Sequence, residues 1–373
     1  HPLPAPEGFS VSELVRADLP FSDPVKEPKP GVWKRISALV KSAPPPPQPL
    51  PAPGPSLAPT PGIWLACLAT GAPLPERFVP AATPVRDTAL ALLALAGPHA
   101  PGAAWLRSRA LPGAAWPRQF AASLDSHTEK TALALLALRR AEPASAPPGQ
   151  PLAWLREQQG RHGGWAACTA GLDEPFRPAL PFPGAFAGAD PACPALTGLA
   201  LEALAAWGAA PEDPAVRRGV EFLTRSQLAR DGSWTSRWGV HFLHGTCFAL
   251  RGLRAAGFDD HDAVVLRAGE WLRSVQNADG GWGESPASVE ADEYLEAPSN
   301  AVQTAWAVLG LIAGGDRASE SVRRGVDYLL RTQSPAGAWA PACAMLHVPP
   351  SVYLANPLDA ISFPMLALRE AGA

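Results

Sequence analysis

The stretch "QNADGGW", residues 276–282, is one copy of a pattern that recurs along the chain and decides its fold. Two other copies of Q-x-x-x-G-x-W have the same length: "QGRHGGW", residues 159–165, and "QSPAGAW", residues 333–339. A copy one residue longer, "QLARDGSW", occupies residues 227–234, and a degenerate copy ends at Trp116. The tryptophans are about 50 to 70 residues apart, a spacing that fits one pair of helices per repeat.

Two kinds of segment alternate between these copies. An amphipathic, arginine-bearing segment leads into each glutamine, and a segment rich in alanine and leucine follows each tryptophan. Because the second kind is apolar on nearly all sides, we expect it to be buried. These predicted inner helices are residues 86–97, 128–141, 193–208, 244–257, 300–315 and 358–373. The outer partners begin near residues 100, 149, 213, 261 and 318.

This alternation predicts an all-α protein with a single (α/α)6 toroid, in which an inner ring of helices is surrounded by an outer ring. A sixth outer helix must come from upstream of the repeats. Each part of the repeat has a structural role. The glutamine amide can bond backbone groups at helix ends, the glycine allows a tight turn, and the indole packs over the junction.

The first 62 residues follow a different pattern. Residues 41–62, "KSAPPPPQPLPAPGPSLAPTPG", form a proline-rich spacer that is incompatible with helix. Residues 32–43 carry apolar side chains at helical spacing and predict a short amphipathic helix, which either docks on the main domain or lies on a membrane surface. We therefore predict an N-terminal extension over residues 1–62 and a barrel over residues 63–373.

Composition excludes several classes of protein. The formal net charge is -3 and only 17% of residues are charged, so the chain lacks the basic footprint of a nucleic-acid-binding protein. Five scattered cysteines without a C-x-x-C pair favour neither a disulfide framework nor a zinc site, and they indicate a reducing compartment such as the cytoplasm. We predict no metal and no cofactor. No run is long and apolar enough for a membrane span, and no secretory leader is expected.

The repeats, together with residues 231–258 and "SVQNADGGWGES", residues 274–285, closely resemble those of the class II triterpene cyclases, squalene-hopene cyclase in particular. The resemblance extends over residues 80–373 and implies the carboxy-terminal barrel of that family. Family members add a second barrel, with the substrate cavity between the two. In this chain the proline-rich segment stands where the second barrel would be inserted. A single barrel would therefore be open at one end unless the N-terminal residues, a partner or a second copy covers it.

The resemblance also implies a mechanism, in which an aspartic acid of a D-x-D-D stretch protonates an alkene or epoxide and aromatic side chains stabilise the cations. Aligned through "TALALLAL", residues 131–138, that stretch falls on residues 127–130, where no aspartate remains. Glu129 holds the position of the proton donor, and His127 could orient it. Asp359 on the last inner helix is a relocated acid, a terminating base or, alternatively, a helix cap after Pro357.

The implied binding pocket contains aromatic and polar side chains. The aromatic candidates could stabilise a cation, although ordinary core packing explains them equally well; they are Phe120, Trp238, Phe242, Trp306 and Phe363. The polar candidates are Arg86, Asp87, Lys130 and His244. For Asp87, capping of its helix is the alternative to binding. For His244, binding in the pocket and a structural role at the start of its inner helix both stay open.

Two observations oppose a donor role for Glu129. Ser126-His127-Thr128-Glu129 has the S-x-x-E form of a capping box, in which glutamate is ionised and bonded to the Ser126 backbone N–H. A Lys130 ammonium within about 4 Å would also favour the ionised glutamate by about 4 kcal/mol. A buried carboxyl group with a histidine or second carboxyl in reach would favour the donor role, whereas a solvent-facing Glu129 would favour the cap.

Three functions follow from these alternatives. The first is a class II terpene cyclase-like enzyme that cyclises or isomerises an isoprenoid by protonation. The second is a relative that binds an isoprenoid or lipid without chemistry. The third is other acid–base chemistry on a more polar substrate in the remodelled pocket. In the first two, the ligand is a hydrophobic molecule of isoprenoid type, and peripheral contact with a membrane is an analogy drawn from the family.

Overall fold

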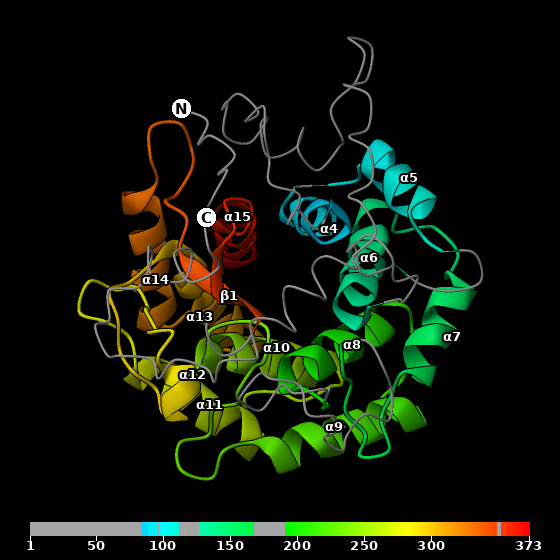
Figure 1. Cartoon of the computed structure of the whole chain (residues 1–373), viewed down its shortest axis with the longest axis horizontal. Coiled ribbons are helices and arrows are strands. Elements are labelled where there is room, and N and C mark those ends of the chain that lie inside the picture. The colour runs from blue at the N-terminus through cyan, green and yellow to red at the C-terminus, as the bar shows by residue number, and fades with distance from the viewer. Residues whose placement is uncertain (1–83, 96, 112–115, 117–126, 168–190, 349–351) are drawn as a thin grey trace, which may run out of the picture. The chain divides into compact units, whose positions relative to one another are not determined.

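The structure, a computed structural model, describes residues 84–373 apart from residues 96, 112–115, 117–126, 168–190 and 349–351 (Figure 1). The chain divides into the units His1–Leu57 and Ala58–Ala373, and all described residues belong to the second. The predicted helix at residues 32–43, the proline-rich spacer and Phe120 lie outside the described residues. The domain boundary at residue 62 stays a prediction.

The inner helices form a closed ring. Each packs against the next along the chain, and the last packs against the first, as Figure 1 shows. In chain order they are α4 (Pro84–Ala94), α6 (Thr128–Ala141), α8 (Pro194–Ala206), α10 (His241–Ala255), α13 (Ala301–Ala313) and α15 (Asp359–Ala371). All correspond to the predicted inner segments, and α6 has the predicted bounds.

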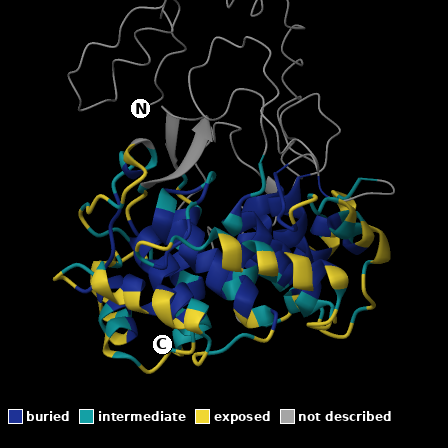
Figure 2. Cartoon of the chain, turned by 90° about the horizontal axis from the view of Figure 1, so that it is seen from below, coloured by how far each residue is buried: buried dark blue, intermediate teal, exposed yellow. Residues whose placement is uncertain are grey.

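The outer helices lie around this ring, and each contacts at least one of the inner helices that flank it (Figure 1). They are α5 (Ala100–Ser108), α7 (Gly149–Glu157), α9 (Pro214–Ser226), α11 (Ala263–Ser274) and α14 (Glu320–Thr332). In Figure 2 their outward faces are exposed, whereas the inner helices are almost wholly buried. The (α/α)6 toroid is thus confirmed, and the described residues include five of its outer helices.

Two short elements were not predicted. The helix α12 (Ser288–Ala291) follows the Q-x-x-x-G-x-W copy at residues 276–282. The strands β1 (Cys343–Val348) and β2 (Val352–Ala355) pair antiparallel between α14 and α15, with Cys343 opposite Ala355. Val348, Val352 and Tyr353 favour strands, but the rest of "CAMLHV" and "VYLA" does not account for this departure from an all-helical chain.

The repeat joins the ends of helices from both layers. In the copy at residues 276–282, the indole Nε1–H of Trp282 donates to the Leu272 carbonyl at the end of α11, at 2.8 Å. The Trp282 backbone N–H donates to Oγ1 of Thr304 on α13, at 2.9 Å. The amide of Gln276 donates to the carbonyl of Ser321 in the first turn of α14, at 3.0 Å. One repeat therefore fixes an inner helix between two outer ones.

The same indole bond recurs in the other copies. The pairs are Trp116 with Leu106, Trp165 with Leu155, Trp234 with Leu223 and Trp339 with Leu329. The glycine of the repeat has a positive φ, +89° at Gly280, where an added Cβ would lie 2.8 Å from the Arg324 carbonyl oxygen. The predicted roles of tryptophan, glutamine and glycine are confirmed, and the indole additionally supplies a hydrogen bond.

Both ends of the inner helices carry an arginine bonded to carboxylates of neighbouring helices. At the C-terminal ends, Arg251 of α10 bonds Glu202 of α8 at 2.5 Å and Glu370 of α15 at 2.9 Å. The N-terminal ends carry the cluster described below. Among the helices that the structure describes, none combines the length and the apolar character that crossing a membrane requires.

Candidate functional site

The N-terminal ends of three inner helices bring charged side chains together. Arg86 lies in the first turn of α4, Glu129 in the first turn of α6, and Asp359 is the first residue of α15. Because the ring closes between α15 and α4, residues far apart in the sequence become neighbours. The positive ends of the helix dipoles also favour carboxylates at these positions.

Arg86 is bonded to two of these carboxylates. Its Nε donates to Oε1 of Glu129 at 2.8 Å, its Nη1 to Oδ1 of Asp359 at 2.5 Å, and its Nη2 to Oδ2 of Asp359 at 3.3 Å. Oδ1 of Asp87 lies 3.6 Å from Nη1. The exposed fractions are 5% for Arg86, 9% for Glu129 and 1% for Asp359, so the cluster is almost dry.

Asn356 connects two of the carboxylates. Its Nδ2 donates to Oδ1 of Asp87 at 3.2 Å and to Oδ1 of Asp359 at 3.4 Å. The neutral amide adds hydrogen bonds but no positive charge. One guanidinium therefore faces three carboxyl groups, Asp87, Glu129 and Asp359.

The two main carboxyl groups respond in opposite directions. Burial alone would raise the pKa of Glu129, but Arg86, followed by His127 and Lys130, outweighs burial and holds that pKa below its usual range. Burial raises the pKa of Asp359, Arg86 opposes this only in part, and the negative charge of Glu129 adds to the rise. Asp359 is thus the group that retains a proton most readily, and Glu129 is held ionised.

Arg86 itself stays charged. Burial opposes its charge, but Asp359 and then Glu129 and Asp87 together raise its pKa above the usual value. Its guanidinium carbon lies 6.0 Å from the centroid of the Phe363 ring, so the ion cluster borders the aromatic part of the site.

The capping-box alternative for Glu129 does not hold. The residue before the first helical residue of α6 is His127, and Ser126 lies outside the described residues. The Glu129 carboxylate accepts from Arg86 inside the ring instead of facing solvent. The cap alternative for Asp359 fails for a similar reason: the N-cap of α15 is Leu358, and the Asp359 carboxyl is bonded to Arg86.

His127 and Lys130 lie beside the cluster. Both are buried, and their charges act on Glu129. The His127 ring meets the Trp238 ring edge to face, with 5.9 Å between centroids. Trp238 is partly buried and precedes α10, so its ring connects this loop with His127.

An aromatic group continues the site across the ring. Trp306 of α13 lies 5.6 Å from Phe363 of α15 and 4.7 Å from His244 of α10, measured between ring centroids. Phe248, which the sequence did not single out, lies 4.7 Å from His244 and 6.4 Å from Phe363. Three of the predicted binding residues, His244, Trp306 and Phe363, are therefore brought together.

Phe242 lies elsewhere. Its ring is 6.4 Å from Trp271 of the outer helix α11 and 5.4 Å from the guanidinium carbon of Arg230. It thus packs between the two layers instead of facing the cluster. Phe242 and His244 are two positions apart on α10, so they point in different directions.

A carboxylate that sequence reasoning missed caps α10. Glu284 accepts from the backbone N–H groups of His241, Phe242 and Leu243 at 2.9 to 3.1 Å. The N-cap residue of α10, Val240, has no polar side chain, so Glu284 supplies the missing acceptor. The sequence signal that could have found Glu284 is its position two residues after Trp282, because that tryptophan is buried at a helix junction.

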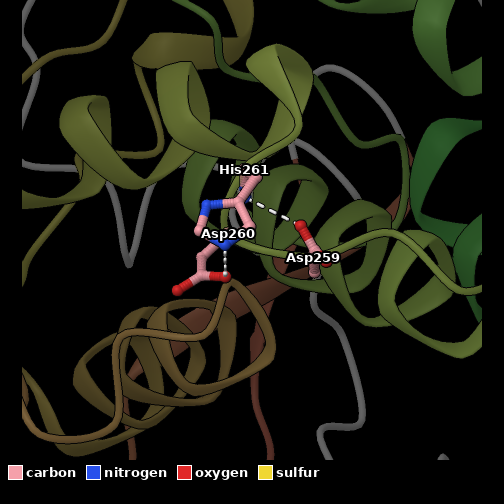
Figure 3. Close-up of side chains that lie close together, drawn as sticks. All are labelled: Asp259, Asp260 and His261. Carbon is pink, nitrogen blue, oxygen red and sulfur yellow. Dashed lines mark hydrogen bonds and ion pairs between the residues drawn. The ribbon is translucent and has the colours of Figure 1, made fainter.

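Three adjacent residues could in principle hold a metal ion. Asp259, Asp260 and His261 occupy one turn after α10, with ligand atoms within 4.8 Å of one another (Figure 3). The Asp259 carboxylate accepts from the His261 backbone N–H at 2.8 Å, which the turn itself requires. Side-chain exposure of 89% for His261 and 57% for Asp260 describes a solvated turn, and the prediction of no metal site stays a prediction.

The closed helix ring and its buried charged end define a single toroid of the terpenoid cyclase type. The chain belongs to the squalene-hopene cyclase family: the family model of the squalene-hopene cyclase C-terminal domain matches residues 61–372.

Curated relatives agree with this assignment. A probable squalene–hopene cyclase of Sinorhizobium fredii is 41% identical over 189 residues, which cover 50% of this chain and 29% of the relative. The squalene–hopene cyclase of Bradyrhizobium diazoefficiens is 39% identical, with 50% of this chain and 28% of the relative covered. The matched part is therefore less than a third of the length of these relatives.

Solved structures match over more of the chain. The type II terpene cyclase MstE from Scytonema has a TM-score of 0.59 at 17% identity, covering 83% of this chain and 97% of that structure. The ent-copalyl diphosphate synthase from Streptomyces platensis has a TM-score of 0.54 at 22% identity, covering 78% of this chain and 50% of the other. At these identities the likeness concerns the fold.

Proposed function

We propose that the chain binds an isoprenoid at the N-terminal end of the inner ring and starts its cyclisation or isomerisation by protonation. Asp359 is the proton donor, and Glu129 is its ionised partner. The curated relatives are squalene–hopene cyclases, and one structural neighbour was solved in complex with geranylgeranyl dihydroxybenzoate as substrate. The aromatic group beside the ion cluster fits such an apolar chain.

The observation that carries this proposal is the sharing of Arg86 by Glu129 and Asp359. Two buried carboxyl groups whose environments move their pKa values apart are the usual arrangement of an acid and its partner. The position that the family resemblance gives to the donor is held by Glu129, but its salt bridge with Arg86 keeps it ionised. The more deeply buried Asp359 takes over the donor role.

In the proposed step, the O–H bond of Asp359 breaks and the proton forms a bond to an alkene carbon or an epoxide oxygen of the substrate. Asp359 is left as a carboxylate bonded to Arg86, and the substrate becomes a carbocation. Trp306 and Phe363 present aromatic faces that stabilise a cation. Loss of a proton from the cation, or addition of water, ends the reaction and allows Asp359 to be reprotonated.

The remaining candidates act around this pair. His127 and Lys130 keep Glu129 ionised, and Asp87 forms an ion pair with Nη1 of Arg86. The proposal has three further parts. A partner or a second copy covers the open barrel end, the substrate is taken up at a membrane surface, and the protein is located in the cytoplasm.

A second function, binding of an isoprenoid without chemistry, is favoured by one observation. Both oxygens of Asp359 and one oxygen of Glu129 are already bonded to Arg86. These hydrogen bonds give both carboxyl groups a structural role that needs no bound ligand. In that case the cluster would only stabilise the ring closure between α15 and α4.

Product formation separates the two functions. The full chain is incubated with squalene, 2,3-oxidosqualene and geranylgeranyl-bearing compounds, beside the variants Asp359→Asn and Glu129→Gln, and extracts are examined by gas chromatography and mass spectrometry. We expect product from the unmodified chain and a loss of at least about 100-fold in Asp359→Asn, typical for removal of a general acid. Binding of these substrates without any product contradicts the proposed enzymatic function. The same holds if Asp359→Asn keeps its helicity and forms as much product as the unmodified chain.

A further inference from the structure

The imidazole of His244 is held in one tautomer by its neighbours. Its Nδ1 lies 2.9 Å from Oγ of Ser236. That oxygen also accepts from the backbone N–H groups of Trp238 at 3.2 Å and Gly239 at 3.3 Å. A hydroxyl has two acceptor positions and one donor, so the Ser236 O–H donates to Nδ1. His244 therefore carries its proton on Nε2.

The loop before α10 also fixes the position of this ring. A Cβ added to Gly239 would lie 2.3 Å from both Cγ and Cδ2 of His244, so only glycine allows the ring to lie there. His244 is 3% exposed, and burial lowers its pKa to about 3. The ring is neutral at ordinary pH, and Nε2–H is an uncharged donor.

This region holds two N–H donors. Nε1 of Trp306 is buried without a hydrogen-bond partner among the described residues. The hydrogen bond of the His244 ring in that part of the chain is made by Nδ1, which leaves Nε2–H available to a ligand. The two rings are 4.7 Å apart between centroids, at 82° to each other. A buried N–H without an acceptor is costly, so the Trp306 indole calls for an acceptor that the described residues do not supply.

We infer that Nε2–H of His244 and Nε1–H of Trp306 form a subsite for an uncharged oxygen of the ligand: a hydroxyl, carbonyl or epoxide oxygen on an isoprenoid. This inference rests on the proposed function, because it concerns the ligand of the same site. Both donors are neutral, and the ionised Glu129 acts electrostatically on His244, so an anionic oxygen is disfavoured. The surrounding rings of Phe248 and Phe363 accommodate the apolar remainder.

The subsite has a chemical consequence for the proposed reaction. The influence of Glu129 and Arg86 on His244 places the ion cluster within electrostatic reach of the bound oxygen. An epoxide or hydroxyl oxygen is more basic than an alkene carbon. A carboxyl group with a raised pKa, such as Asp359, is a weak acid and suits the more basic acceptor. An epoxide oxygen has two lone pairs, so one of the two N–H···O hydrogen bonds breaks as the O–H bond of Asp359 breaks and its proton bonds to the oxygen. The substrate class is therefore an oxygenated isoprenoid in preference to a hydrocarbon.

A matched pair of ligands tests the subsite. Squalene and 2,3-oxidosqualene differ by one oxygen, and their dissociation constants are measured in detergent with the full chain carrying Asp359→Asn, which blocks turnover. We expect oxidosqualene to bind about 10-fold more tightly, as for one or two hydrogen bonds to an uncharged acceptor. In His244→Phe and in Trp306→Phe this preference falls to about 3-fold or less, while squalene binding changes less than about 2-fold.

Two further variants keep the test sharp. In His244→Gln the amide N–H can occupy the place of Nε2–H, so part of the oxygen preference should return. His241→Phe perturbs the same loop, because His241 Nδ1 lies 2.5 Å from the Ser236 carbonyl oxygen, but it leaves both donors in place and should keep the preference. Thermal unfolding midpoints confirm that each variant is folded.

The outcomes are distinguishable. Equal binding of the two ligands, as expected if only water occupies the subsite, overturns the inference and leaves the proposed function intact. A preference that survives in His244→Phe also overturns it, and one that survives in Trp306→Phe overturns the part assigned to Trp306. Failure of both ligands to bind defeats the proposed function, and the inference fails with it.

Discussion

Nε of Arg86 lies 2.8 Å from Oε1 of Glu129, although 43 residues separate the two in the sequence. This salt bridge decides how the acid cluster works. It holds Glu129 in the ionised form, and the negative charge of Glu129 in turn contributes to the raised pKa of Asp359. In the proposed reaction, Glu129 at the family's donor position is therefore the ionised partner, and Asp359 on the last inner helix is the acid.

The first prediction concerns the pH dependence of activity. Asp359 must be protonated to donate, so activity should fall as the pH rises through its raised pKa. Glu129→Gln removes a negative charge beside Asp359, and Arg86 then has one carboxylate fewer to compensate. Both changes favour the ionised form of Asp359 and lower its pKa. The pH at which kcat/KM declines on the alkaline side should therefore be lower in the variant. At a fixed alkaline pH, kcat/KM should be about 10-fold lower than in the unmodified chain for each pH unit of this displacement.

The control for this prediction is Glu142→Gln, because Glu142 pairs with Arg107 on the surface, away from the cluster. Its profile should overlay that of the unmodified chain. A Glu129→Gln profile displaced to higher pH would contradict the assignment of donor and partner.

The second prediction concerns stability. Arg86→Met leaves Glu129 and Asp359 buried without their cation, which should lower the free energy of unfolding by about 3 to 5 kcal/mol. Adding Asp359→Asn removes one of the uncompensated charges and should recover part of this loss. Urea unfolding of the single and double variants measures both effects. Arg107→Met breaks an exposed pair and should cost less than about 1 kcal/mol; equal costs for the two arginines would contradict the role of burial.

The third prediction concerns the repeat. Thr304→Val preserves shape but leaves the buried N–H of Trp282 without its acceptor, so the free energy of unfolding should fall by about 1 to 3 kcal/mol. The matched control is Thr224→Val, whose hydroxyl is exposed and bonds the Val220 carbonyl in its own helix. That change should stay within about 0.5 kcal/mol. Equal midpoints in urea for the two variants would show that the junction bond is not stabilising.

The ring could be predicted from the sequence because its pattern is repeated and local. The segment at residues 128–141 is apolar on nearly every side, which assigns it to the inner ring, and α6 has these bounds. The repeat copies mark the junctions between helices, because each copy combines a glycine for a tight turn with a tryptophan that packs over the helix ends. The hairpin of β1 and β2 lies in the interval between two helices, where the pattern carries no signal.

The candidate residues could be named from the sequence, but their pairing could not. Arg86 and Asp359 are 273 residues apart and meet only because the last inner helix packs against the first. The same limit applies to α10, whose first turn mixes histidines with apolar residues in the sequence "HFLH", residues 241–244. The sequence could not distinguish Phe242, directed toward the outer layer, from His244, directed toward the aromatic group.

The last prediction concerns Glu284, the carboxylate that caps α10. Burial raises its pKa to about 7, although the N–H groups of His241, Phe242 and Leu243 favour the charged form. The folded chain therefore holds a proton on Glu284 at a pH where the unfolded chain has released it. The resulting stabilisation is complete below the unfolded pKa of about 4.3 and is lost as the pH rises through about 7.

Glu284→Gln removes this titration while keeping a carbonyl oxygen that can accept from the same N–H groups. Between pH 5 and pH 8, the free energy of unfolding should fall by up to about 3 kcal/mol more in the unmodified chain than in the variant. Urea unfolding at several pH values measures the difference, and the exposed Glu157→Gln should follow the unmodified chain. A variant with the same pH dependence as the unmodified chain would mean that Glu284 stays ionised at the end of α10, held by its backbone donors.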